Sequence, residues 1–190
     1  MSDRRNFLRG AAALGASLLV PQIGHATDND FWVRDRELWV RRARPRRELE
    51  EFRVVYWSGD HFDANNYVRL CYLFRDSNED VVAEIDPRLF HLLFGLQRWV
   101  QLETGRLLPI DLTSGYRTPE HNSMLIAEGA SPTSEHLNGR AADIRIPGVS
   151  PDSVVSMARF FEMGGVGIYN SFTHVDVGRV RAFIGRRPRR

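Results

Sequence analysis

Apolar residues recur at helical spacing in the middle of the chain, within "IDPRLFHLLFGLQRWVQLETG". The repeat of three and four residues places five of them on one face and predicts a long core helix: Leu89, Leu92, Leu93, Leu96 and Val100. Asp86-Pro87 is a favourable start, with the acid as cap and the proline in the first turn, and Gly105 is the predicted end. A shorter helix with one apolar face is predicted over about 64–74.

Two further helices are predicted to begin at prolines. Thr118-Pro119-Glu120 opens a helix that ends at Gly129, and Ser150-Pro151-Asp152 opens one that ends near 164–165. Alternating segments between these helices predict strands. They are one or two strands ending at Trp57, a buried strand over 107–113, and strands over 141–146, 165–169 and 172–177, the last two joined by an Asn170-Ser171 turn. Helices packed on a small, largely antiparallel sheet predict an α+β domain.

Composition adds limits to this picture. The chain has 190 residues, 43% of them hydrophobic and 26% charged, and no internal repeat, as expected for one soluble globular domain. All 26 basic residues are arginines, scattered or in two short clusters, and the formal net charge is only +2, which argues against a nucleic-acid partner. Cys71 is the only cysteine, so an intramolecular disulfide is excluded.

The N-terminal segment has the features of an export signal. Arg4 and Arg5 precede an apolar run over 11–20, and small residues at 24–26 offer a cleavage point. The run is about half of the roughly twenty residues that span a bilayer, so no stable membrane span is expected. "RRNFL" resembles the twin-arginine signal. We expect a signal peptide over 1–26, a single domain over 27–190, export by the twin-arginine translocation machinery and a periplasmic location; the alternative is an amphipathic N-terminal helix.

Three polar residues stand among small or apolar neighbours. In "SEHLNGRAADI", His136 and Asp143 are separated by seven positions with Gly139 and two alanines between them, and "THVD" adds His174. Two imidazoles and a carboxylate are a ligand set for one Zn²⁺ ion, with the fourth position left for water. From spacing alone the alternative is a core that contains hydrogen-bonded histidines.

Four motifs in series then identify a family resemblance. "SGYRT" at 114–118, "SEHLNGRAAD" at 134–143, "GGVGIY" at 164–169 and "HVD" at 174–176 resemble the zinc D-Ala-D-Ala peptidases, whose fold is shared with VanX-type dipeptidases and the hedgehog domain. The resemblance covers roughly residues 35–184 and is closest to murein endopeptidases of the MepK (YcbK) kind. Several motifs in order are far more specific than one.

The resemblance implies roles for these residues. His136, Asp143 and His174 would hold one Zn²⁺ ion, and Arg117 would act catalytically by holding a substrate carbonyl or the oxyanion formed from it. Ser134 would orient the loop of His136, and it is expected to line the substrate-binding cleft with Tyr116 and Tyr169, although the tyrosines are equally consistent with structural packing.

The resemblance does not transfer a general base directly to this chain. VanX-type relatives place an acid three residues before the last zinc histidine, and Ser171 stands there in this chain. Asp176 shares a strand face with His174 and is the expected replacement as a catalytic base. It is equally consistent with a partner that orients the His174 ring, and Glu135 and His121 are further candidates.

The function implied is that of an exported zinc metallopeptidase that hydrolyses the peptide cross-links of peptidoglycan. A D,D- or L,D-carboxypeptidase is the alternative within the enzymes. A non-catalytic, zinc-containing wall-binding domain is the alternative outside them, and Ser171 in place of the acid favours it.

Overall fold

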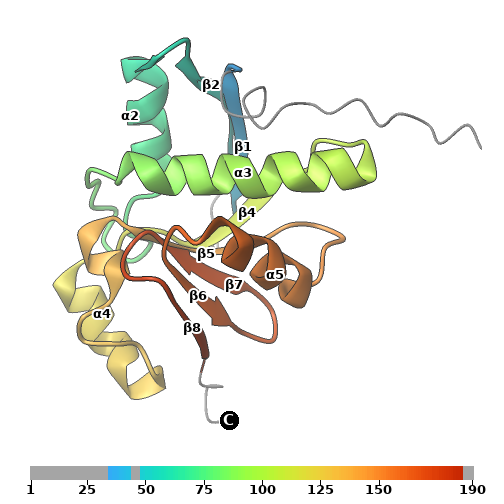
Figure 1. Ribbon diagram of the computed structural model, residues 1–190. Coiled ribbons are helices and arrows are strands. Elements are labelled where there is room, and N and C mark those ends of the chain that lie inside the picture. The colour runs from blue at the N-terminus through green and yellow to red at the C-terminus, as the bar shows by residue number, and fades with distance from the viewer. Residues whose placement is uncertain (1–33, 44–47, 186–190) are drawn as a thin grey trace, which may run out of the picture. The chain divides into compact units, whose positions relative to one another are not determined.

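The alternating segments of the chain form one mixed sheet. In the computed structural model, which describes residues 34–43 and 48–185, the strand order is β3-β2-β1-β4-β5-β7-β6-β8 (Figure 1). The strands are β1 (Arg36–Arg42), β2 (Glu50–Ser58), β3 (His61–Phe62), β4 (Ile110–Ser114), β5 (Ala141–Arg145), β6 (Gly165–Ile168), β7 (Thr173–Asp176) and β8 (Arg181–Ile184). Neighbours run antiparallel except in the pairs β1–β4 and β6–β8, so the predicted α+β fold with a largely antiparallel sheet is confirmed.

Each described α-helix begins at a residue whose side chain caps it. The helices are α2 (Ala64–Leu73), α3 (Pro87–Thr104), α4 (Pro119–Leu125) and α5 (Pro151–Phe161). The capping side chains of Asp63, Asp86, Thr118 and Ser150 each accept a hydrogen bond from a backbone N–H in the first turn. Such a bond satisfies one of the donors that a helix start leaves unpaired, which is why the predicted starts of α3, α4 and α5 are correct.

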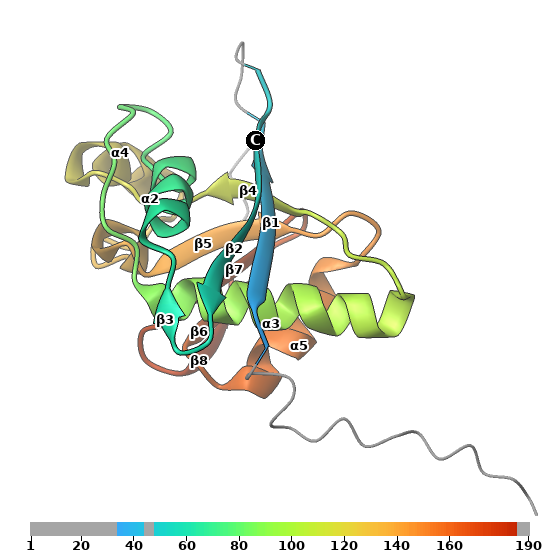
Figure 2. The ribbon, with the colours of Figure 1, turned by 90° about the horizontal axis from the view of Figure 1, so that it is seen from above.

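Three helices bury the apolar face of the sheet. α3 packs against β1 and α5, α5 against β6 and β7, and α2 against β2. Phe90 of α3 contacts Phe74, just after α2, with ring centroids 5.3 Å apart, which ties the two helices together. Figure 2 shows β1 and β2 side by side, with α2 next to β2.

Thr173 shows which face of β7 is covered by α5. Its hydroxyl donates to the carbonyl oxygen of Pro151 at the start of α5. Because side chains alternate along a strand, Val175 lies on the same face as Thr173, and His174 and Asp176 lie on the opposite one. The predicted polar face of this strand is therefore turned away from α5.

Several boundaries differ from the predictions, and α4 itself ends at Leu125, with a 3-10 turn over Ile126–Glu128 before the predicted end at Gly129. Ile168 pairs with Thr173, so four residues connect β6 to β7 in place of the predicted two-residue turn, and Tyr169 and Phe172 stack on each other at 4.2 Å. The strand predicted over 107–113 is β4, at 110–114, and the helix predicted to reach 164–165 ends at Phe161. Glu162 ends that helix in the left-handed conformation.

No helix within the described residues is both long and apolar enough to cross a membrane. The predicted signal peptide over 1–26 lies outside the described residues.

Candidate metal centre

A row of register partners crosses five neighbouring strands. Ser114 of β4 pairs with Asp143 of β5, Asp143 with His174 of β7, His174 with Gly167 of β6, and Gly167 with Phe183 of β8. Register partners project from the same face of a sheet, so the row brings Asp143 and His174 side by side. A side chain at position 167 would collide with the Phe183 ring, whose centroid lies 5.6 Å from that of His174.

His136 reaches the same point from a short 3-10 helix over Glu135–Asn138. The side chain of Ser134 caps this turn by accepting from the backbone N–H of His136. Gly139 ends the turn with φ of 62°, and a Cβ there would lie 2.3 Å from the carbonyl oxygen of Glu84, so glycine is needed on both counts. The chain thus returns into β5 directly after the histidine.

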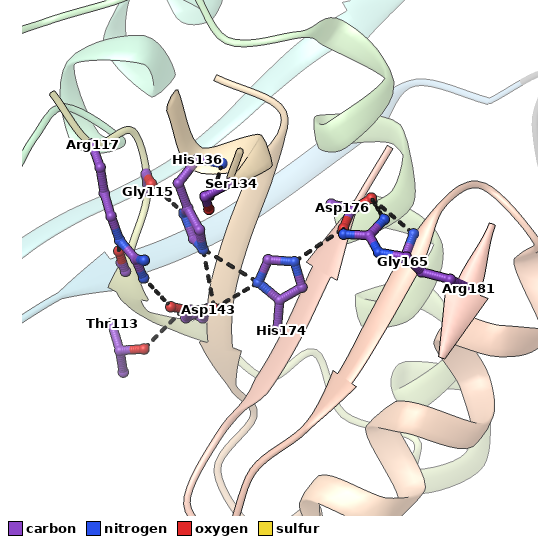
Figure 3. A network of polar contacts seen from close by, with 11 residues as sticks. Thr113, Gly115, Arg117, Ser134, His136, Asp143, Gly165, His174, Asp176 and Arg181 are labelled. Carbon is purple, nitrogen blue, oxygen red and sulfur yellow. Dashed lines mark hydrogen bonds and ion pairs between the residues drawn. The ribbon is translucent and has the colours of Figure 1, made fainter. Parts of the chain in front are cut away.

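Three ligand atoms converge where these segments meet. His136 Nε2 lies 3.2 Å from His174 Nδ1 and 3.3 Å from Asp143 Oδ1, and His174 Nδ1 lies 2.9 Å from Asp143 Oδ1 (Figure 3). The three residues are 1%, 6% and 7% exposed. Bonds of about 2.0–2.2 Å at tetrahedral angles would separate two ligand atoms by about 3.3–3.6 Å. The set therefore has the composition and nearly the spacing of a three-ligand zinc site.

Hydrogen bonds behind the histidines determine which ring nitrogen is free. His136 Nδ1 lies 2.6 Å from the carbonyl oxygen of Gly115, which can only accept, so Nδ1 donates and Nε2 keeps its lone pair. His174 Nε2 lies 3.0 Å from Asp176 Oδ2 in the same way, which leaves Nδ1 of the neutral ring with its lone pair. With both rings neutral, two lone pairs and a carboxylate oxygen face one another, an arrangement that either a proton or a metal ion between them would stabilise.

The pKa shifts of the three residues agree with this interpretation. Burial lowers the pKa of His136, which favours a neutral ring. Burial would also lower the pKa of His174, but hydrogen bonds to Asp143 and Asp176 outweigh it and raise that pKa above its ordinary value. Burial would raise the pKa of Asp143, but the adjacent His136 and His174 outweigh it and hold that pKa well below the usual range. The site therefore favours positive charge, as a proton or as a metal ion.

Asp176 is a buried partner of His174 and is fully enclosed. Its Oδ1 accepts from the backbone N–H groups of Gly165 and Gly178, and its Oδ2 accepts from Arg181 Nη2 at 2.7 Å as well as from His174. Burial would raise the pKa of Asp176, but these hydrogen bonds lower it. Asp176 contacts His174 on the side of the ring opposite to the free Nδ1. This placement favours the orienting alternative over the predicted base.

Arg117 occupies the other end of the network. Its Nη2 donates to Asp143 Oδ2 at 2.6 Å and its Nε to Ser114 Oγ at 2.9 Å. The backbone N–H of Arg117 donates to the carbonyl oxygen of His136 at 3.1 Å. Figure 3 shows the order Arg117, Asp143, His174, Asp176, Arg181, in which cation, carboxylate, imidazole, carboxylate and cation follow one another.

A cavity of about 550 Å³ opens over the three ligands. Arg117, Ser134, Glu135 and Tyr169 line it, whereas Tyr116 is not among the described residues that do so. Tyr116 instead fixes its loop, because its backbone N–H donates to the carbonyl oxygen of Phe74 at 2.8 Å. Ser171, at the position of the acid in VanX-type proteins, lines a different cavity beside α5.

One element of this site was not predicted from the sequence. β8 was not predicted, although it supplies Phe183 and Arg181. The four residues of β8 read polar, apolar, apolar, apolar and do not alternate in polarity, so the sequence gives no strand signal there.

Comparisons with known proteins all point to one family. A family model described as "Peptidoglycan L,D-endopeptidase MepK" matches residues 35–183. The peptidoglycan L,D-endopeptidase MepK of Escherichia coli (strain K12) is 31% identical over 185 residues, which cover 95% of this chain and 96% of the relative. The probable peptidoglycan L,D-endopeptidase MepK of Haemophilus influenzae is 36% identical over 121 residues, which cover 62% of this chain and 63% of the relative.

Proposed function

The chain belongs to the peptidoglycan L,D-endopeptidase MepK family, and from this premise we propose that it is a zinc metallopeptidase that hydrolyses peptide cross-links of peptidoglycan. The observation that carries the proposal is the convergence of two imidazole lone pairs and a carboxylate oxygen on one buried point beneath an open cavity. A zinc ion bound there by His136 Nε2, His174 Nδ1 and Asp143 would lower the pKa of a bound water to roughly 7 and polarise a substrate carbonyl.

Arg117 is proposed to bind the substrate carbonyl oxygen and the negative charge that develops on it. One of its guanidinium nitrogens is held by Asp143 and another by Ser114, so the group is fixed beside the ligands before substrate arrives. The side chain is 12% exposed and lines the cavity, so its interaction with an oxyanion would be weakly screened by water.

Two carboxylates are proposed to have separate roles, one in orienting a histidine ring and one in proton transfer. Asp176 orients the His174 ring and keeps the proton on Nε2, as partners of metal-bound histidines commonly do. Glu135 is, with Asp143, one of the two carboxylates among the described residues that line the cavity, and its Oε2 has no hydrogen-bond partner there. We assign Glu135 the transfer of the proton from the attacking water to the leaving amine.

Export completes the proposal, because peptidoglycan lies outside the cytoplasmic membrane. Residues 1–26 would serve as a twin-arginine signal and residues 27–190 as the single periplasmic domain. Replacement of Arg4 and Arg5 by lysine is expected to retain the protein in the cytoplasm, which cell fractionation measures.

The first test is mass spectrometry of muropeptides released from purified sacculi by the protein, with and without a chelator. Loss of cross-linked dimers and gain of the matching monomers is expected only when zinc is available, and His136→Ala should abolish it. The dimers consumed identify the bond. Shortened stems with intact cross-links would instead show a carboxypeptidase, and no change with folded, zinc-loaded protein would support a wall-binding domain.

A further inference from the structure

Three arginines line the cavity over the ligands, and only two of them are engaged by acidic side chains. Arg117 is paired with Asp143 at 2.6 Å, and Arg181 is paired with Asp176 at 2.7 Å. Arg179 is exposed, and within residues 34–43 and 48–185 its guanidinium group makes no hydrogen bond or ion pair. Its five N–H donors are therefore available to a ligand.

The backbone that carries Arg179 is fixed although its side chain is free. Arg179 lies in the connection from β7 to β8, and its carbonyl oxygen accepts from Arg181 Nη1 at 3.0 Å. The preceding residue, Gly178, donates its backbone N–H to Asp176 Oδ1 at 2.9 Å. Asp176 also accepts a hydrogen bond from His174, so the backbone at Arg179 is positioned relative to a proposed metal ligand.

A substrate of the proposed reaction carries an anion suited to this group. The name of the family specifies an L,D-bond, which joins the carbonyl of an L-centre to the nitrogen of a D-centre, and the carbon that bears this nitrogen also bears a carboxyl group. Where that carboxyl group is neither amidated nor extended, it is a carboxylate two bonds from the scissile nitrogen. A guanidinium group binds a carboxylate through two parallel hydrogen bonds and in a defined orientation.

We propose that Arg179 binds the free carboxylate on the D-centre of the cross-link and so makes the enzyme selective for cross-links that retain this charge. The inference rests on the proposed function. It adds a specificity-determining residue that touches the substrate but takes no part in bond cleavage. Arg117 is already assigned to the substrate carbonyl oxygen, and the guanidinium group of Arg181 is paired with the buried carboxylate of Asp176, so Arg179 is left for this second anion.

Two synthetic L,D-cross-linked dimers test the proposal, identical except that the D-centre carries a carboxylate in one and a carboxamide in the other. For the parent protein kcat/KM should be about 10- to 100-fold higher on the carboxylate dimer, the range expected for one charge-assisted interaction. Arg179→Gln should remove this preference by lowering kcat/KM on the carboxylate dimer alone. Arg179→Lys should restore part of it, and the exposed Arg159→Gln on α5, which does not line the cavity, should change nothing.

The outcomes separate the inference from the function on which it rests. If the zinc-loaded parent cleaves neither dimer nor sacculi, the proposed function fails. If the parent cleaves both dimers with equal kcat/KM, or if Arg179→Gln lowers both values equally, Arg179 is not a carboxylate receptor although the enzyme is a peptidase. Bound zinc, measured in each variant, should equal that of the parent, and its loss would show a structural role instead.

Discussion

The two histidines of the centre use different ring nitrogens, Nε2 in His136 and Nδ1 in His174. The difference follows from their partners, a backbone carbonyl behind His136 and a carboxylate behind His174. That His136, Asp143 and His174 lie together could be predicted from sequence, because small neighbours and motif order mark them. The choice of nitrogen could not, because Gly115 and Asp176 act through contacts that spacing does not encode.

Substitutions of Asp176 and Glu135 should affect different quantities, zinc affinity in one case and kcat in the other. Asp176→Asn should weaken zinc binding by about 10- to 100-fold, because His174 loses its orienting acceptor. Its turnover should return when zinc is saturating. Glu135→Gln should bind zinc like the parent but lower kcat by about 100-fold or more, as expected for the loss of a proton-transfer group.

Zinc titration against a chromophoric chelator and kinetics at full occupancy measure both effects. Glu128→Gln, at an exposed position, is the control. If Asp176→Asn stays inactive with zinc fully bound, Asp176 transfers the proton and the assignment above is reversed.

At the scale of elements, the sheet positions the centre by register. The starts of α3, α4 and α5 and the segments of most strands could be predicted, because caps, prolines and apolar alternation are local signals. The connection between β6 and β7 could not, because the stacking of Tyr169 on Phe172 replaces the predicted pairing. The row from Ser114 to Phe183 depends on pairing between strands distant in sequence, which no local pattern contains.

The loop before α4 gives the prediction at this scale. A Cβ at position 115 would lie 2.3 Å from the carbonyl oxygen of Phe74, so Gly115→Ala should push the loop away from α2. The shift should destabilise the protein by about 1–3 kcal/mol, as overpacking does. It should also weaken zinc binding, because the carbonyl of Gly115 holds His136.

Urea unfolding with excess chelator and zinc titration of the folded protein separate these two effects. Ser123→Ala, at an exposed position of α4, should leave both within error of the parent. Unchanged zinc affinity in a destabilised Gly115→Ala variant would show that His136 does not depend on this loop.

At the scale of the whole molecule, a histidine outside the metal centre makes the free energy of unfolding depend on pH. His91 of α3 stacks on Phe62 and packs against Trp57, and its Nδ1 accepts from Arg36 Nη1 at 2.8 Å. Burial, followed by the charge of Arg36, lowers the pKa of His91 from 6.5 to about 4. Between about pH 6.5 and pH 4, His91 is therefore protonated in the unfolded chain and neutral in the folded chain.

The free energy of unfolding should accordingly fall as the pH falls from 6.5 to 4, and this part of the fall should be absent in His91→Gln. Urea unfolding at several pH values with chelator present measures it. His61→Gln, whose side chain is 76% exposed, is the matched control. A parent and a His91→Gln variant with parallel pH profiles would contradict the prediction.

His136 and His174 are 38 positions apart, and the chain between them includes β5, α5 and β6. An ion bound by both closes this stretch into a ring. A chain closed in this way has fewer conformations when unfolded. By the loop-entropy relation used for disulfides, a ring of this length raises the free energy of the unfolded chain by about 4 kcal/mol as long as the ion stays bound. With Cys71 as its only thiol, the chain cannot form an internal disulfide. A zinc ion bound as proposed would supply a cross-link of the kind that small secreted domains obtain from disulfides.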